Sequence, residues 1–477
     1  MTTPTLPLVS LSADELDLIT HLRTDLMAHR FRLDLLDSYF NGEQLVRDLG
    51  ISIPSQLKGL HTVIGWPRIG VEALEQRLDL EAFRWADGSD AADLEAVAES
   101  NDLFDECSLA HLDALTYGRE YVTVGSAEEP DLPPIITYES PLDMTLEWDA
   151  RLRVALSALR ESTGNRMGFG LADDDRMVSL YLPNQTVYAV ESPGGGWEVV
   201  ERDAHRLGVV PVLRMANRQR TGDRVGKSEI TPEVMSITDA ACRRLMGIEV
   251  AAEFFGAPAR WILGASEAAF QDADGNPKSA WETYIGRVLA LERDEEGELP
   301  QVGQFTAHDP SGQTKIIDLY ARIMATQLGL PPHMLGYTSD NPASADAIRS
   351  SEGMLVKKAE RRIRRFSATH RDSMRLALWM WRGQVPDGRI ECVWRNPATP
   401  TIAAQTDAAV KMVQAGLLPP DSDVALEMAG LSEDQRQRVA AERRRAQGRQ
   451  ILDRLTELGD EEQPDEEPED SGGDDGL

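Results

Sequence analysis

PEVMSITDAACRRLMGIEVAAEFF, residues 232–255, decides the architecture, because it places a long helix in the middle of the chain. Thr231 followed by Pro232 is typical of a helix start, and Gly256 and Pro258 mark its end. We therefore predict one helix of about 24 residues, about 36 Å long. Its apolar residues recur at intervals of three and four, at Val234, Ile237, Ala241, Leu245, Ile248, Ala252 and Phe255.

Two further long helices are predicted on the C-terminal side. SGQTKIIDLYARIMATQLGL, residues 311–330, is helical in pattern until PPHMLGYTSDNP, residues 331–342, a loop rich in Pro, Gly, Asn and Asp. Beyond this loop, apolar positions from Ile348 to Trp381 predict a helix of about 40 residues, about 60 Å long. The residues between the first two helices mix short strands, one small helix and acidic turns, which predicts a compact α/β unit.

The N-terminal half reads as helices followed by strands. Ser12 and Glu15 form a capping-box pattern that starts a helix of several turns, which ends at YFNGEQ, residues 39–44. A second helical segment, residues 91–118, passes into the strand REYVTVG, residues 119–125. Short β runs between turn clusters then predict an antiparallel meander from Met167 to Met215.

The C-terminal part reads as a short strand, RIECVW at residues 389–394, followed by several short helices up to about residue 455. Residues 456–477 are crowded with Asp, Glu, Pro and Gly, a composition that predicts a disordered acidic tail. The predicted fold class is therefore α+β, mainly helical.

Composition excludes several classes of protein. The 477 residues suit two to four domains, and no apolar run approaches the roughly twenty residues of a membrane-spanning helix. The N-terminus lacks the pattern of a secretory signal, and the three cysteines lie far apart, so we expect a cytoplasmic protein with reduced thiols. The 49 Lys and Arg against 80 Asp and Glu, a net charge of −31, disfavour tight, sequence-reading binding of nucleic acid.

TGDRVGKSEI, residues 221–230, resembles a nucleotide-binding loop but fails its spacing. Three residues separate Gly222 from Gly226, where a phosphate-cradling loop needs four, and the next helix starts only at Pro232. We therefore interpret it as a charged linker entering a helix. The sequence offers no catalytic set, no metal-ligand pattern and no cofactor motif, so none is predicted.

Two basic stretches could meet phosphates. NRQRTGDRVGK, residues 217–227, brings Arg218, Arg220, Arg224 and Lys227 just before the first long helix. VKKAERRIRRF, residues 356–366, lies on the longest helix, where a solvated or subunit-pairing face is favoured over DNA contact because the whole chain is acidic. Its cations are Lys357, Lys358, Arg361, Arg362, Arg364 and Arg365.

Most of the chain resembles a known family. The order and spacing of LLDSYFNGEQ (35–44), ALTYGREYVTVG (114–125), LGVVPVLRMANR (207–218), residues 226–264 and GLPPHMLGYTSDNPASADAIRSSEGML (329–355) are similar to the portal proteins of tailed double-stranded DNA bacteriophages, of the siphovirus type. The resemblance implies a portal fold: a wing at 1–228, a first stem helix at 229–255, an α/β clip at 256–311 and a second stem helix at 312–330. It further implies a tunnel loop at 331–345, a long helix returning through the wing at 346–400 and a helical crown at 401–455.

The same resemblance implies a function. Portal subunits form a ring, usually a dodecamer, at one capsid vertex, and double-stranded DNA passes through it without sequence specificity during packaging and ejection. The ring would be assembled in the host cytoplasm, become part of the virion, and dock the large terminase, scaffold, major capsid protein and a head-completion or adaptor protein. ATP would be hydrolysed by the terminase, so the portal itself would not be an enzyme.

The resemblance also suggests which residues meet DNA. Tyr337, Thr338, Ser339, Asp340 and Asn341 would lie in the tunnel loop, and the basic stretch at 217–227 would supply possible backbone contacts. Two alternatives stay open: a nucleotide-dependent enzyme using residues 222–228, and a monomeric helical adaptor.

Overall fold

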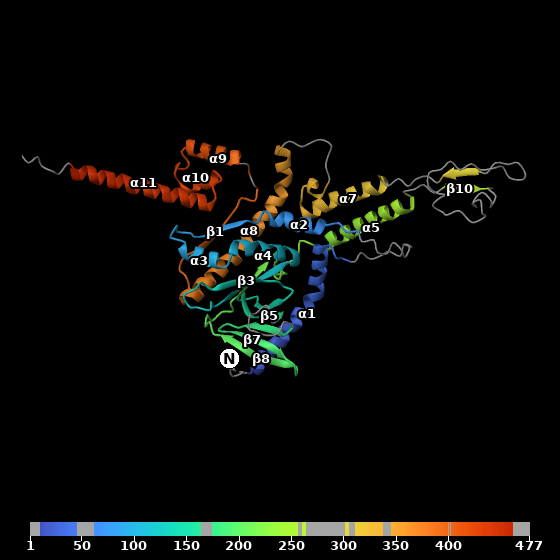
Figure 1. Cartoon of the computed structure of the whole chain (residues 1–477), viewed down its shortest axis with the longest axis horizontal. Helices are drawn as coiled ribbons and strands as arrows, with labels where there is room; N and C mark the ends of the chain where they lie inside the picture. The colour runs from blue at the N-terminus through green and yellow to red at the C-terminus, as the bar shows by residue number, and fades with distance from the viewer. Residues whose placement is uncertain are drawn as a thin grey trace, which may run out of the picture.

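The computed structural model describes residues 10–44, 62–163, 174–255, 260–263, 301–304, 311–336, 345–398, 400 and 402–460 (Figure 1). The described chain is mixed helix and sheet, as predicted. Its helices are α1 (Ala13–Asn41), α2 (Trp66–Glu75), α3 (Ala92–Ser100), α4 (Leu103–Tyr117), α5 (Pro232–Phe255), α7 (Ser311–Leu328), the 3-10 turn η4 (Pro332–Leu335), α8 (Ala345–Arg382), α9 (Ile402–Gln414), α10 (Asp423–Met428) and α11 (Glu433–Asp460). No helix within these ranges is both long and apolar enough to cross a membrane.

The largest sheet is an antiparallel meander of five strands in the order β4-β5-β6-β7-β8. The strands are β4 (Met144–Asp149), β5 (Val154–Thr163), β6 (Arg176–Tyr181), β7 (Thr186–Ser192) and β8 (Gly196–Asp203). Ile19 and Leu22 of α1 pack on this sheet, against Leu159 of β5 and Val178 of β6. The capping box of Ser12 and Glu15 begins α1, as predicted, because each side chain accepts a backbone N–H of the other residue.

The predicted limits of the meander were wrong at both ends. Two strands, β4 and β5, precede residue 167, whereas β9 (Val212–Ala216) leaves the meander for a second sheet in the order β3-β2-β9. In that sheet β2 (Arg119–Gly125) lies between β9 and β3 (Ile135–Glu139). A further sheet has two strands, in which β1 (Leu80–Trp85) pairs with β12 (Ile390–Trp394), although the two are far apart in the sequence.

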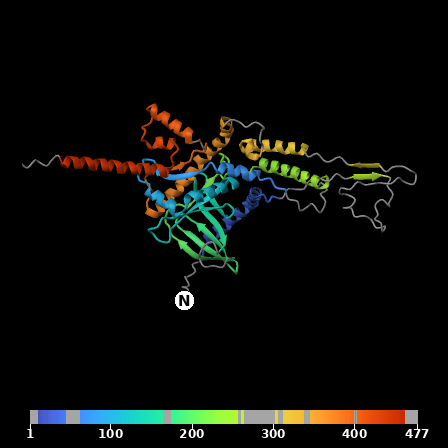
Figure 2. The ribbon, with the colours of Figure 1, turned by 45° about the horizontal axis from the view of Figure 1, so that its top comes forward.

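Helices α5 and α7 form an arm that points away from the body (Figures 1 and 2). Helix α5 has the predicted bounds, and at the far end of the arm β10 (Arg260–Leu263) pairs with β11 (Gln301–Gln304). The small helix expected between residues 256 and 311 lies outside the described residues. Helix α8 follows with 38 residues, close to the predicted length, and it ends at Arg382, before Gly383 and the predicted strand, which is β12.

Other predictions need correction. The segment 91–118 is two helices, because Asp102 takes a left-handed conformation (φ 47°) between α3 and α4. The C-terminal helices are not all short, since α11 has 28 residues. It reaches Asp460, so residues 456–460 are helical and not part of a disordered tail, while 461–477 lie outside the described residues.

A polar cluster is buried in the core between α4 and α8. The Nε2 atoms of His111 and His370 lie 2.8 Å apart, and His370 Nδ1 lies 3.2 Å from the Tyr138 hydroxyl. Both histidines are fully buried, and His111 stacks between Phe366 and Trp394. Burial holds the His370 pKa at about 3, and burial, together with the neighbouring His370, lowers the His111 pKa well below its usual value. Both rings are therefore neutral at pH 7.

Candidate nucleic-acid interface

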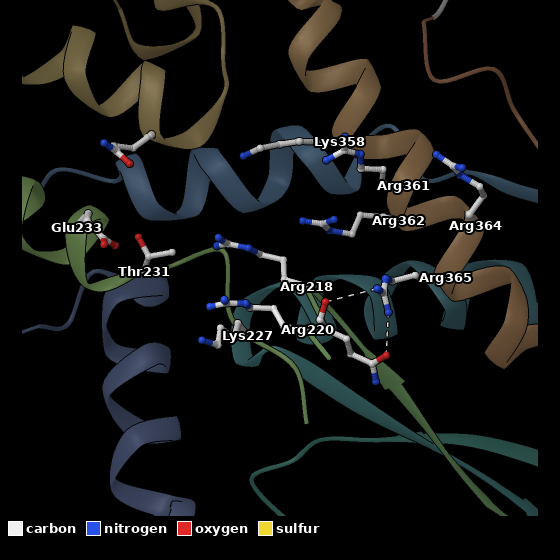
Figure 3. A pocket seen from close by; sticks show the side chains of 12 residues that line it. Arg218, Arg220, Lys227, Thr231, Glu233, Lys358, Arg361, Arg362, Arg364 and Arg365 are labelled. Carbon is white, nitrogen blue, oxygen red and sulfur yellow. Dashed lines mark hydrogen bonds between the residues drawn. The ribbon is translucent and has the colours of Figure 1, made fainter. Parts of the chain in front are cut away.

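The two basic stretches of the sequence line one groove of about 880 Å³, which we call the basic groove (Figure 3). One wall is the segment 217–231 that leads into α5, the other is α8, and Gln327 of α7 lies at the rim. The only carboxylate among the lining residues is that of Glu233. The cations are Arg218, Arg220, Lys227, Lys358, Arg361, Arg362, Arg364 and Arg365.

All four predicted backbone-contacting residues lie here. Arg218, Arg220 and Lys227 line the basic groove, and Arg224 lines an adjoining hollow of about 360 Å³ together with Arg220 and Arg365. The Arg365 guanidinium donates to Gln219 Oε1 at 2.8 Å, which ties α8 to the segment 217–231 (Figure 3). The α8 cations were interpreted as a solvated or subunit-pairing face, and no pattern in the sequence indicates that they share a groove with residues 217–227.

A single buried carboxylate, that of Glu229, lies against three of the cations that line the basic groove. The Glu229 side chain is 4% exposed, and Arg362 donates to its Oε1 at 2.6 Å. Lys358 Nζ lies 3.8 Å and Arg218 Nη1 4.0 Å from the same carboxylate. Burial acts to raise the Glu229 pKa, but these cations outweigh it and hold the pKa below its usual value. Glu229 is therefore ionised at neutral pH and compensates part of a crowded positive charge.

The positive charge around Glu229 is not fully balanced. Three cations face this one carboxylate. The pKa of Lys358 is lowered, mainly by burial and further by the neighbouring Arg362 and Arg218, although the attraction of Glu229 acts to raise it. Arg362 Nε is buried and has no acceptor within the described part of the chain. The groove thus carries excess positive charge, a property of a site for an anion such as phosphate.

The Gly-Lys-Ser stretch forms part of this wall but is not a phosphate cradle. Its central backbone N–H group and that of the residue after the stretch are already used: Lys227 N donates to Asn217 O at 2.9 Å, and Glu229 N donates to Leu115 O at 2.9 Å. The Ser228 hydroxyl donates to Thr116 O at 2.5 Å. A phosphate loop needs a run of successive free N–H groups, and the bonds of Lys227 and Glu229 interrupt that run.

The other predicted site residues cannot be compared with the groove, because they fall outside the described residues. Tyr337, Thr338, Ser339, Asp340 and Asn341 are outside the described residues, which stop at Gly336, after η4, and resume at Ala345. Across the described ranges, no three His, Cys, Asp or Glu side chains are grouped as a metal ion would need.

Comparison with known proteins identifies the family. Residues 20–449 match the model of the family described as phage portal protein, SPP1 Gp6-like. The chain is 36% identical over 389 residues to the portal proteins of Mycobacterium phage D29 and Mycobacterium phage L5, covering 79% of this chain and 77% of each relative. A solved structure, the neck of a native GTA particle computed with C12 symmetry, is similar at 16% identity with a TM-score of 0.43, over 77% of this chain and 90% of that one. On the family model and the mycobacteriophage relatives, the chain belongs to the phage portal protein family, SPP1 Gp6-like.

Proposed function

We propose that copies of this chain form a ring, a dodecamer in its simplest form, around a channel for double-stranded DNA at one vertex of the phage capsid. The observation that carries this proposal is the family match over residues 20–449. Members of this family are structural components of the phage particle and not enzymes. The ring would assemble in the host cytoplasm and dock the large terminase, scaffold, major capsid protein and a head-completion protein.

The arrangement of the chain supports a division into parts. Residues 1–228 would be the wing, and α5 and α7 would be the two stem helices, within 229–255 and 312–330. The arm holds the paired strands β10 and β11 away from the body (Figure 2), and these strands would belong to a clip at 256–311. Residues 331–345 would be the tunnel loop, 346–400 the return through the wing and 401–455 the crown.

The charge distribution fits a conduit better than a tight binder. Twelve copies would carry about −370 charges before counterions, and such walls repel the phosphate backbone, so DNA would not be trapped. The basic groove is the exception, and we propose that Arg218, Arg220, Arg224 and Lys227 make brief backbone contacts there, with the tunnel loop residues 337–341 as further contacts. Such contacts read no sequence and weaken with salt.

The first experiment is to image the purified full-length chain and measure its particle mass. A perforated ring with a mass many times 52.7 kDa supports the proposal, whereas a particle of monomer mass at every concentration favours the adaptor alternative. Lys227→Ala tests the enzyme alternative, because an ATPase would lose turnover and a portal has none to lose.

The second experiment measures binding of a random-sequence duplex at several salt concentrations. Arg220→Ala/Arg224→Ala removes two exposed groove cations, and we expect the slope of log K against log salt to fall by about 1.8, at about 0.9 for each phosphate contact. Arg32→Ala/Arg151→Ala is the matched control, since it removes the same charge from exposed positions outside the groove. Equal slopes for the two double variants would rule out the groove as the DNA contact.

A further inference from the structure

Helix α11 projects from the body after a short anchored region (Figures 1 and 2). Arg436, 3% exposed, pairs with Asp423 at 2.8 Å and with Glu427 at 3.3 Å, which fixes the first turns to α10. Gln437 Nε2 donates to Glu95 Oε1 of α3 at 3.0 Å, so this end of α11 also touches the helix α3. With 28 residues the helix is about 42 Å long, and most of it extends beyond these contacts.

The face of α11 that touches α3 continues outward beyond this contact. Arg444 and Ile451 follow Gln437 at intervals of seven residues and therefore lie on the same face, with Arg445 and Leu452 beside them. Ile451 is 59% and Leu452 64% exposed. Arg444 and Arg445 make no ion pair with any carboxylate in the described ranges. We call this surface the arm face; it is basic and apolar together.

The helices α3 and α4 carry a surface of the opposite kind. Between Ala86 and Gly118 the chain contains no Lys or Arg. On this surface Phe104 is 39% and Leu109 60% exposed, so two apolar side chains lie in an acidic surround. The exposed carboxylates are those of Glu95, Glu99, Asp102, Asp105 and Glu106. An apolar centre with a charged rim is the usual anatomy of a protein interface, and we call this surface the acidic face.

We propose that the arm face of one copy docks on the acidic face of the next copy in the ring. The proposal rests on the proposed ring function and adds the surfaces that hold neighbours together. The arm face is basic and apolar, and the acidic face is acidic and apolar, so the two are complementary. Within one chain, the first turns of α11 already contact α3 through Gln437 and Glu95. Arg444 to Leu452 lie about 10 to 22 Å past Gln437 along the helix, beyond that internal contact. Two different complementary surfaces on each copy give a head-to-tail interface, which can close into a ring.

DNA is the other polyanion that the arm face could meet. A phosphate backbone would satisfy Arg444 and Arg445 but would leave Ile451 and Leu452 exposed to water. The acidic face offers partners for both kinds of side chain, which is why a second copy is favoured.

The test places one cysteine on each surface. Under mild oxidation, Arg445→Cys/Asp105→Cys should give a ladder of disulfide-linked oligomers on a denaturing gel, and each single variant should give none. The native thiols are unsuited to forming this ladder, because Cys107 and Cys242 are buried and Cys392 is partly buried.

Charge reversal gives a second measurement. Arg444→Glu/Arg445→Glu should raise the concentration needed for half-assembly by about tenfold or more, Asp105→Arg/Glu106→Arg should do the same, and the four changes together should restore assembly. If the double-cysteine variant forms rings but no ladder, and the charge-reversal variants assemble like the wild type, the proposed ring is not refuted but this interface is wrong. Reversal of the arm face that weakens DNA binding but not assembly would also overturn it. A wild-type chain that never forms rings would instead refute the proposed function.

Discussion

The buried histidine pair predicts a specific loss of stability in acid. His370 is fully buried with a pKa of about 3, against about 6.5 for an unfolded histidine. Because the folded pKa is depressed, stability is fully present above pH 6.5 and is lost as the pH falls toward 3. From pH 7.5 to 4.5, the loss through His370 alone is about 2.7 kcal/mol, or about 1.4 kcal/mol per pH unit below pH 6.5. His111, whose pKa is also lowered, adds to the same loss.

The assay is urea unfolding followed by far-UV circular dichroism between pH 4 and 7.5, for the wild type and His370→Gln at one fixed chain concentration. Glutamine is close in size and can keep a hydrogen bond to His111 Nε2, but it does not titrate. We expect the pH slope of the unfolding free energy to fall by about 1.4 kcal/mol per pH unit in the variant.

Other buried groups act in the opposite direction and cancel in this comparison. Burial raises the Asp113 pKa to about 6 and, with Asp113 and Glu139 adding to the effect, raises the Glu120 pKa well above its usual value. Their protonation in the fold adds stability as the pH falls, equally in both proteins. If the two slopes agree within about 0.3 kcal/mol per pH unit, His370 is not held neutral by burial and the reasoning is wrong.

Three further substitutions test the groove wall and the first helix, each by urea or thermal unfolding. Glu229→Gln should cost about 3–5 kcal/mol because it leaves buried cations uncompensated, whereas Glu360→Gln, which breaks an exposed pair, should cost under about 1 kcal/mol; equal costs would contradict the central role of Glu229. Gly226→Ala should destabilise by about 1–3 kcal/mol or more, because its φ is +112° and a Cβ would lie 2.0 Å from Gly118 O, while Gly222→Ala, with open space around it, should change stability by less than about 0.5 kcal/mol. Ser12→Ala should cost about 1 kcal/mol through the lost cap of α1, and a change below about 0.3 kcal/mol would mean that the cap is frayed in solution.

The helix bounds were predicted well where the sequence contains capping residues or a proline at the helix start. Helix α5 has its predicted bounds because Pro232 begins it, and α1 begins at its capping box. The break between α3 and α4 was missed because apolar spacing continues across it, and only the left-handed backbone of Asp102 shows where the first helix ends. Helix start and stop signals depend on a few neighbouring residues. Asp can adopt the left-handed backbone conformation at modest cost, so its presence at residue 102 does not by itself predict a break.

Strand partners and the groove depend on residues far apart in the chain. The run at 207–215 was predicted as the end of the meander, yet β9 pairs with β2, a choice that no local pattern encodes. The groove walls are likewise about 140 residues apart, and their link is Glu229, one carboxylate that follows a basic run. Glu229 is a single carboxylate that follows several cations just before a helix. This pattern could have indicated that some of those cations are partly buried and paired with it.

The resemblance of residues 222–228 to a nucleotide loop now has a physical explanation. Glycine is needed where a backbone must come close to another group, and that group can be a phosphate or a peptide. Here Gly226 approaches Gly118, and the N–H groups on either side are bound within the chain, Val225 N to Asp223 Oδ1 and Lys227 N to Asn217 O. These donors are not available to a phosphate, whereas the flexible Lys227 side chain lines the groove. Side chains of this kind can follow a moving phosphate backbone from one group to the next, whereas a cradle of fixed amides would hold it. The same close packing that excludes a nucleotide site would therefore suit the brief DNA contacts that we propose for the basic groove.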